Sequence, residues 1–254
     1  MLPYWIFFII PAMAALTAQP RKRLHSDGAR VVRPTAAWWL VTTGLIIIIG
    51  FRYQVGVDWG NYFRYLHAAH QMNLNDLVGV EDPGYWALNI ISVQLGLGMT
   101  GVNVLGGALF SLGLLHFCLS LPRPWLALAC ALPYLVTVVA MGYTRQAIAI
   151  GLVMIGLVAL QRTRYLRFGL WIILGALFHK SAVLLVPIAA MTASRKRFQA
   201  IGLVGALGFF GYEALLADYA DRLVSVYTDA NIQSQGAFIR LSMNALPGAL
   251  FLVF

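Results

Sequence analysis

The stretch WWLVTTGLIIIIGFRYQVGVDWGNY, residues 38–62, changes abruptly from an apolar run to a polar, aromatic segment. The apolar part belongs to a region over residues 35–51, which is long enough to cross a bilayer as a helix. The polar part contains two charged side chains, Arg52 and Asp58, among several aromatic rings. Such a change is typical of a spanning helix that ends in a polar segment outside the hydrocarbon.

The composition places the whole chain in the membrane class. Of its 254 residues, 60% are hydrophobic and 11% are charged, and the mean hydropathy is +0.77. Soluble domains contain about 25% charged residues. We therefore expect an all-α, polytopic integral membrane protein that forms one transmembrane domain over residues 1–254.

Apolar segments of spanning length recur along the chain. With two ambiguous stretches, they predict about 8 to 10 membrane segments. The last segment is expected to be incomplete, because the chain stops within an apolar run. The clear segments are 2–18, 35–51, 102–121, 125–143, 145–161, 198–216 and one that begins near Leu241; the ambiguous stretches are 85–97 and 167–193.

The positions of the basic residues indicate which loops lie on the cytoplasmic side of the membrane. The formal net charge is +9, and most of the 18 Lys and Arg residues fall in short clusters at 21–33, 162–167 and 195–197. Positively charged loops between apolar segments stay in the cytoplasm. This distribution argues against nucleic acid as a partner. It also predicts a retained first helix with its N-terminus outside, because the basic residues follow that helix.

Each crossing changes the side of the membrane on which the next loop lies, and this limits how the two ambiguous stretches can be arranged. If each crossed the membrane once, the cluster at 162–167 would lie outside, against the charge rule. We expect instead that residues 85–97 lie in the outer interface or re-enter. Residues 167–193 are expected to form a re-entrant hairpin of two short helices that meet at His179 and Lys180. The alternative is a plain crossing that leaves Arg123 outside and one exception to the rule.

Polar residues gather on the predicted outer side. The loop at 52–84 contains Asp58 and three more acidic residues, and a helix over 57–66 would put Asp58 and Tyr62 on one face. Gly56 allows a bend before that helix. The aromatic rings of this segment suit either sugar rings or the bilayer interface, and the interface is the simpler interpretation.

Two further polar positions interrupt apolar surroundings. Arg145 and Gln146 open an apolar segment at its outer end, where Arg145 either has a function or only reaches for the interface. Ala147 and Gly151 form a small pair that predicts close helix packing. His179, beside Lys180, is either functional or a hydrogen-bonded core residue.

Nothing in the sequence calls for a metal or another cofactor. Cys118 and Cys130 lie in apolar segments without a metal-binding spacing, and we expect them to act as small hydrophobic residues. His67 and His70 are three residues apart, but no third ligand accompanies them at helical spacing. The signatures of the common soluble enzymes are also missing from the sequence.

Four short motifs, in order along the chain, resemble the EpsG family of bacterial exopolysaccharide proteins, relatives of the Wzy-type polymerases of O-antigen and capsule synthesis. They are RYQVGVDWGNY (52–62), EDPGY (81–85), TRQAIA (144–149) and FHKSA (178–182). The resemblance implies a multi-pass protein of the bacterial inner membrane. It also implies a glycosyltransferase that joins oligosaccharide repeat units carried on undecaprenyl diphosphate at the outer face. Membrane lipids, and the chain-length regulator and flippase of the same pathway, are the partners to expect.

That reaction suits the residues found above. The leaving diphosphate needs cations, for which Arg52, Arg145 and Arg240 are candidates. The acceptor hydroxyl must lose a proton, and Asp58 is the first candidate for the base and His179 the second. Tyr62 and Gln146 would orient these groups or the sugar.

Three other functions fit parts of the pattern. A ligase would use the same arginines and base on a finished polymer. A flippase of lipid-linked sugars would need polar groups reached from both faces and is expected to show repeats, which the sequence lacks. A non-catalytic subunit of a synthesis complex would tolerate neutral residues at Asp58 and Arg145.

Overall fold

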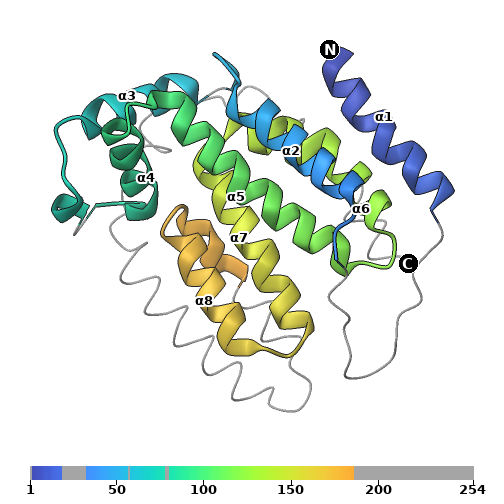
Figure 1. Ribbon diagram of the computed structural model, residues 1–254. Coiled ribbons are helices and arrows are strands. Elements are labelled where there is room, and N and C mark those ends of the chain that lie inside the picture. The colour runs from blue at the N-terminus through green and yellow to red at the C-terminus, as the bar shows by residue number, and fades with distance from the viewer. Residues whose placement is uncertain (1, 19–32, 57, 78–79, 186–254) are drawn as a thin grey trace, which may run out of the picture. The chain divides into compact units, whose positions relative to one another are not determined.

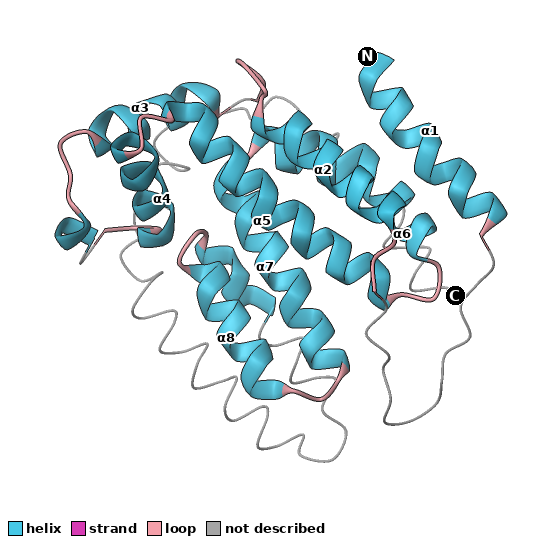
Figure 2. Ribbon diagram, in the orientation of Figure 1, coloured by secondary structure: helices cyan, strands magenta, loops and turns pink. Residues whose placement is uncertain are grey.

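The computed structural model describes residues 2–18, 33–56, 58–77 and 80–185, all within one unit, Met1–Gly208 (Figure 1). These residues form helices joined by short loops, and Figure 2 shows no strand in the part of the chain that is described. The predicted all-α fold is confirmed over these ranges.

The helices follow the predicted apolar segments. The α-helices are α1 (Leu2–Thr17), α2 (Ala36–Gly50), α3 (Trp59–Ala69), α4 (Pro83–Gln94), α5 (Gly98–Ser120), α6 (Pro124–Ala131), α7 (Thr144–Gln161) and α8 (Tyr165–Ala176). Two 3-10 helices, η1 (Leu74–Leu77) and η3 (Lys180–Leu185), and a π-helix, η2 (Leu132–Ala140), complete the described elements.

Two of these helices, α5 and α7, are long and apolar enough to cross a membrane. Shorter apolar helices are α1, α2, α8 and the continuous segment from α6 through η2. The number of crossings stays a prediction, and the expected spans at 198–216 and from Leu241 lie outside the described residues.

The crossing of α5 and α7 forms the centre of the bundle (Figure 1). A Cβ atom on Gly113 of α5 would come within 2.1 Å of the carbonyl oxygen of Gly151 on α7, so the two backbones touch. This contact confirms the close packing predicted at Gly151. From this crossing, α2 packs on the other side of α5, and α8 packs on α7.

Large apolar side chains remain exposed on α1, α2 and α8. Examples are Leu16, Leu40 and Leu166, the last of which is 87% exposed. Large apolar side chains exposed in this way are costly in water and favourable against hydrocarbon. The outward faces of these helices therefore fit the high hydropathy of the sequence.

The predicted hairpin at 167–193 is visible as far as Leu185. α8 ends at Ala176, the chain turns through His179, and η3 packs back against α8. Ala182 of η3 is buried in one cluster with Phe168 and Ile172 of α8. Two short helices therefore meet at His179 and Lys180 as predicted, while their depth in the membrane stays a prediction and residues 186–193 lie outside the described part.

The predicted outer loop at 52–84 contains α3 and η1. The backbone N–H of Tyr62 donates to the carbonyl oxygen of Asp58 at 3.0 Å. The helix expected over 57–66 is confirmed from Trp59 onward, and it continues to Ala69. Gly56 has a φ of +106°, and a Cβ atom there would lie 2.8 Å from Gly142. Glycine therefore allows both the bend and the close approach of this loop to the start of α7.

Candidate active site

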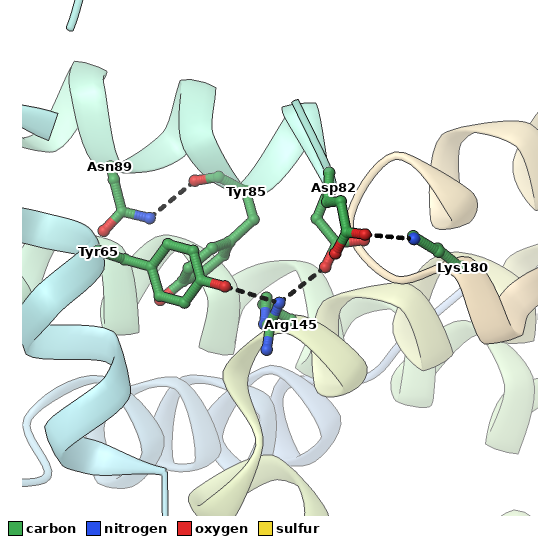
Figure 3. A network of polar contacts seen from close by, with 7 residues as sticks. Tyr65, Asp82, Tyr85, Asn89, Arg145 and Lys180 are labelled. Atoms are coloured by element: carbon green, nitrogen blue, oxygen red, sulfur yellow. Dashed lines mark hydrogen bonds and ion pairs between the residues drawn. The ribbon is translucent and has the colours of Figure 1, made fainter. Parts of the chain in front are cut away.

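Arg145 and Asp82 form the central ion pair of the site. Nη1 of Arg145, in the first turn of α7, lies 2.9 Å from Oδ2 of Asp82, which precedes α4. The same nitrogen donates to the hydroxyl of Tyr65 at 3.3 Å, and the guanidinium carbon lies 5.1 Å from the centre of that ring (Figure 3). Asp82 is 6% exposed and Arg145 is 24% exposed. This pair is therefore largely withdrawn from water, where charges interact more strongly.

The local sequence fixes the position of Asp82. Its φ of 52° and ψ of 55° are left-handed, a conformation that aspartate tolerates better than most residues. Pro83 then supplies the first residue of α4, for which its ring is preorganised. The N–H of Gly84 donates to the carbonyl oxygen of Leu177 at 2.9 Å, so the start of α4 is attached to the hairpin.

Only one oxygen of Asp82 is paired. Its Oδ1 is buried and has no hydrogen-bond partner within the described residues. Burial raises the pKa of the Asp82 carboxyl above its ordinary 3.8, although Arg145 and, to a smaller extent, His179 act in the opposite direction. A buried carboxylate with a free oxygen is chemically suited to accept a proton.

The hairpin brings two more titratable groups to the same place. Nζ of Lys180 lies 2.9 Å from Oε1 of Glu81, the neighbour of Asp82. Nδ1 of His179 is buried and makes no hydrogen bond to any described residue. His179 also interacts electrostatically with Asp82. The EDPGY and FHKSA motifs therefore meet through their side chains, and EDPGY also bonds through its backbone to Leu177, the residue before FHKSA.

Arg52 is directed into the protein. Its guanidinium donates to the carbonyl oxygen of Ala140, to Oγ1 of Thr144, and to Oδ1 of Asn103 at 3.1 Å. These acceptors lie at the end of η2, at the start of α7 and on α5. Arg52 therefore holds the backbone break from which Arg145 projects.

Aromatic side chains of α3 and α4 pack around the ion pair. The ring of Tyr85 lies 5.6 Å from that of Tyr62 and 5.7 Å from that of Tyr65. Tyr62 is buried, which does not suit a bilayer anchor. Burial and then Asp58 raise the pKa of Tyr62, whereas Arg145 lowers it, so its hydroxyl interacts with both charges.

The structure brings together five of the residues that the sequence singled out. The side chain of Gln146 is half-buried beside Arg145 and makes no hydrogen bond to any described residue. Arg240 lies outside the described residues. Those brought together are Arg52, Asp58, Tyr62, Arg145 and His179.

Sequence reasoning placed Asp82 in an outer loop without assigning it a role. Tyr65 and Tyr85 were likewise overlooked as neighbours of Arg145. The available signal was the Pro-Gly pair after Asp82, which marks a tight turn into a helix. Asn89 of α4 was overlooked too; it is buried, and its Nδ2 donates to the carbonyl oxygen of Tyr85 at 2.8 Å (Figure 3).

The described residues do not form a metal-binding site. In the described ranges no group of three or more His, Cys, Asp or Glu side chains is placed to hold an ion. The rings of His67 and His70 are 6.1 Å apart, and Nδ1 of His70 lies 3.0 Å from the carbonyl oxygen of Leu66. Those contacts are accounted for by the helix itself.

Comparison with known proteins identifies the family. No curated protein and no solved structure matches the chain significantly. The sequence pattern of the EpsG family matches residues 35–254, which include all four motifs and every residue of the site. Because this match extends over most of its length, the chain belongs to the EpsG family.

Proposed function

We propose that this protein is a membrane-embedded polymerase of exopolysaccharide synthesis. Its membership of the EpsG family supports a role in exopolysaccharide biosynthesis at a membrane. One observation carries the proposal: four motifs that are far apart in the sequence meet in one polar cluster. The motif at 52–62 contributes Arg52 and Tyr62, and the motif at 81–85 contributes Asp82 and Tyr85. The motif at 144–149 contributes Arg145, and the motif at 178–182 contributes His179 and Lys180.

The proposed reaction joins oligosaccharide repeat units carried on undecaprenyl diphosphate. The hydroxyl of one unit attacks the anomeric carbon of another, and the lipid diphosphate leaves. Arginine suits this leaving group, because its planar fork matches phosphate oxygens. Arg145, partly exposed and at the start of a helix, is the proposed diphosphate-binding residue, and Arg240 is a second candidate from outside the described residues.

The other candidates have supporting roles. Arg52 makes its hydrogen bonds to the protein, which supports a positioning role beside Arg145 better than direct contact with substrate. Asp58 and His179 remain candidates for the base, and Tyr62 and Gln146 for orienting the sugar. The electrostatic interaction of Tyr62 with both Asp58 and Arg145 supports its assignment.

The membrane arrangement belongs to the same proposal. We place the protein in the bacterial inner membrane as a multi-pass protein with its N-terminus outside and the cluster at the outer face. Lipid-linked repeat units, membrane lipids, and the flippase and chain-length regulator of the pathway are its proposed partners. The exposed apolar faces of α1, α2 and α8 support direct contact with lipid.

The test is the polysaccharide made by cells whose only copy carries Arg145→Ala. We expect polymerisation to fall by about 100-fold or more, because charge stabilisation at the leaving group is lost. Single repeat units should then accumulate on lipid outside the membrane. Arg64→Ala is the matched control, since Arg64 is an exposed arginine on α3 that bonds only to Asn61 among the described residues.

The outcomes separate the rival functions. Unchanged long polymer with Arg145→Ala would refute the role of Arg145 and favour a non-catalytic subunit. Single units trapped inside would indicate a flippase. Long polymer that forms but is not transferred to its final acceptor would indicate a ligase.

A further inference from the structure

We infer that Asp82, rather than Asp58, accepts the proton of the acceptor hydroxyl, and that Arg145 moves from Asp82 to the diphosphate when the donor binds. This inference rests on the proposed polymerase function. It assigns the role of proton acceptor to the carboxylate that pairs with Arg145, the cation proposed to hold the leaving diphosphate. In this scheme the carboxylate becomes a stronger base only when the donor is present.

The first support is the geometry of the carboxylate. Oδ2 of Asp82 accepts from Arg145 at 2.9 Å, while Oδ1 is buried and unpartnered among the described residues. A buried carboxylate oxygen without a partner carries a desolvation cost of several kcal/mol unless something compensates it. A free oxygen of this kind is what a proton-accepting group must offer to a substrate hydroxyl.

Asp58 is less well placed for this role. It is half-buried, immediately precedes α3, and its Oδ1 accepts a long contact of 3.4 Å from Nδ2 of Asn61. No cation is paired with it in the described part of the chain. Asp82, by contrast, is directly attached to Arg145, the residue proposed to hold the diphosphate.

The second support is competition for one cation. A diphosphate carries more negative charge than a carboxylate and matches the guanidinium fork, so it competes well for Arg145. When Arg145 turns to the diphosphate, Asp82 loses the neighbour that stabilises its charged form. Loss of a nearby opposite charge raises a carboxyl pKa. Donor binding therefore makes Asp82 a stronger base at the moment when the acceptor must lose its proton.

The surroundings hold Asp82 in place during this exchange. The hydrogen bond from Gly84 to Leu177 and the ion pair of Glu81 with Lys180 both attach its loop to the hairpin. Neither contact involves Arg145. The carboxylate can therefore lose its partner while the backbone that carries it stays fixed.

The step balances in atoms and electrons. The acceptor oxygen forms a bond to the anomeric carbon of the donor sugar, and its proton passes to Oδ1 of Asp82. The bond from that carbon to the diphosphate oxygen breaks, and the diphosphate leaves with the electron pair beside Arg145. After release of the lipid diphosphate, Asp82 returns its proton to water and pairs with Arg145 again.

The experiment compares three variants of the full-length protein, purified in lipid nanodiscs. They are Asp82→Asn, Asp58→Asn and the matched control Glu81→Gln, which alters the other ion pair of the same loop. Two quantities are measured for each: the rate at which purified lipid-linked repeat units are joined, and the affinity for undecaprenyl diphosphate alone.

We expect Asp82→Asn to lower the rate by about 100-fold or more, which is the usual contribution of a general base. Its affinity for undecaprenyl diphosphate should be unchanged or higher, because the carboxylate no longer competes for Arg145. Glu81→Gln should change both quantities less than about threefold, because Glu81 is exposed and the hydrogen bond from Gly84 to Leu177 still attaches the loop to the hairpin. Asp58→Asn should lower the rate much less than Asp82→Asn does.

Two results would overturn the inference. Equal losses of rate and affinity with Asp82→Asn would make Asp82 only a structural counterion of Arg145. Loss of the rate with Asp58→Asn but not with Asp82→Asn would restore Asp58 as the base. A wild-type protein that binds the lipid but joins no units would instead refute the proposed polymerase function itself.

A pH profile gives a test that needs no substitution at Asp82. The base must be ionised, so the rate should fall as the pH drops through the pKa of Asp82. Burial raises this pKa above 3.8, against the effects of Arg145, His179 and Lys180, so the fall should occur at a higher pH than for an ordinary aspartate. The same fall in Asp58→Asn supports the inference, and its disappearance there would contradict it.

Acid unfolding caused by protonation of Asp82 cannot produce the same loss of rate at low pH. Because the folded-state pKa of Asp82 is raised, protonation of Asp82 favours the folded state, and its contribution to stability is lost as the pH rises. Acidification should therefore lower the rate, whereas protonation of Asp82 by itself makes the folded state more stable.

Discussion

Glu81 and Asp82 are adjacent acidic residues whose ion pairs differ in environment. Glu81 is 59% exposed beside Lys180, and surface pairs of this kind contribute only about 0–1 kcal/mol. Asp82 is buried beside Arg145, where loss of one partner leaves the other charge poorly compensated. At the scale of single residues, the environment of a carboxylate depends on its burial as much as on its chemical type.

The contribution of Arg52 to stability also depends on its buried surroundings. Arg52→Lys keeps the charge but loses the planar fork that reaches Ala140, Asn103 and Thr144 together. We expect the free energy of unfolding in detergent to fall by about 1–3 kcal/mol, because buried acceptors lose their donor. Denaturation of the purified protein measures this.

Arg64→Lys, on the exposed side of α3, is the control for Arg52→Lys and should leave the free energy of unfolding unchanged. If Arg52 only positions Arg145, Arg52→Lys should also lower the maximal rate while the pH profile keeps its midpoint. An unchanged stability would show that these hydrogen bonds contribute little to holding the start of α7.

At the scale of elements, the break between η2 and α7 matters most for the site. η2 is a π-helix that ends at Ala140, and π-helical turns occur often at functional positions. The chain then passes through Gly142 into α7, whose first turn contains Arg145. A continuous helix here would leave no free carbonyl at Ala140 for Arg52. The hydrogen bond from Arg52 to Ala140 therefore depends on the break in the helix.

The crossing of α5 and α7 gives the element-scale prediction. In Gly113→Ala the new methyl group would meet the backbone of Gly151 at 2.1 Å, so one helix must shift. We expect a loss of about 1–3 kcal/mol in the free energy of unfolding, as for other overpacked cores. Denaturation in detergent measures it.

Gly169→Ala is the matched control for Gly113→Ala, because it lies in the apolar helix α8 and a Cβ atom there meets nothing within 4 Å. Alanine is also the better helix former, so this variant should be as stable as the wild type or slightly more stable. Equal losses in both variants would mean that α5 and α7 do not touch at Gly113.

At the scale of the whole molecule, topology decides whether the cluster meets substrate outside. In a protein with Cys130→Ser, a cysteine introduced by His179→Cys should react with a membrane-impermeant thiol reagent added to intact cells. The exposed Cys130 is removed because it would react too, whereas Cys118 is buried. Labelling is read by mass shift.

Arg164→Cys in the same Cys130→Ser background is the control for the labelling experiment, because this cysteine is expected on the opposite side of the membrane. The basic cluster at 162–167 is predicted to be cytoplasmic, so this cysteine should react only after the cells are opened. Labelling of His179→Cys from inside alone would reverse the proposed orientation and move the cluster to the cytoplasmic side.

The sequence by itself determined where the helices lie. Hydrogen bonds within a helix are local, and an apolar run sets its length, so α1, α2, α5 and α7 follow the predicted segments closely. The turn at His179 was equally readable, since polar residues interrupt an apolar run there. The four motifs named the family before any contact was known.

Only the tertiary structure decided which polar side chains meet. Asp82 and Arg145 are 63 residues apart, and Arg52 and Thr144 are 92 residues apart. Their contacts depend on how each helix is rotated and where its end is placed, which periodicity within one segment cannot specify. The greater burial of Asp82 compared with Asp58 arises from the packing of α3, α4, α7 and the hairpin, because a carboxylate becomes desolvated only when other elements cover it.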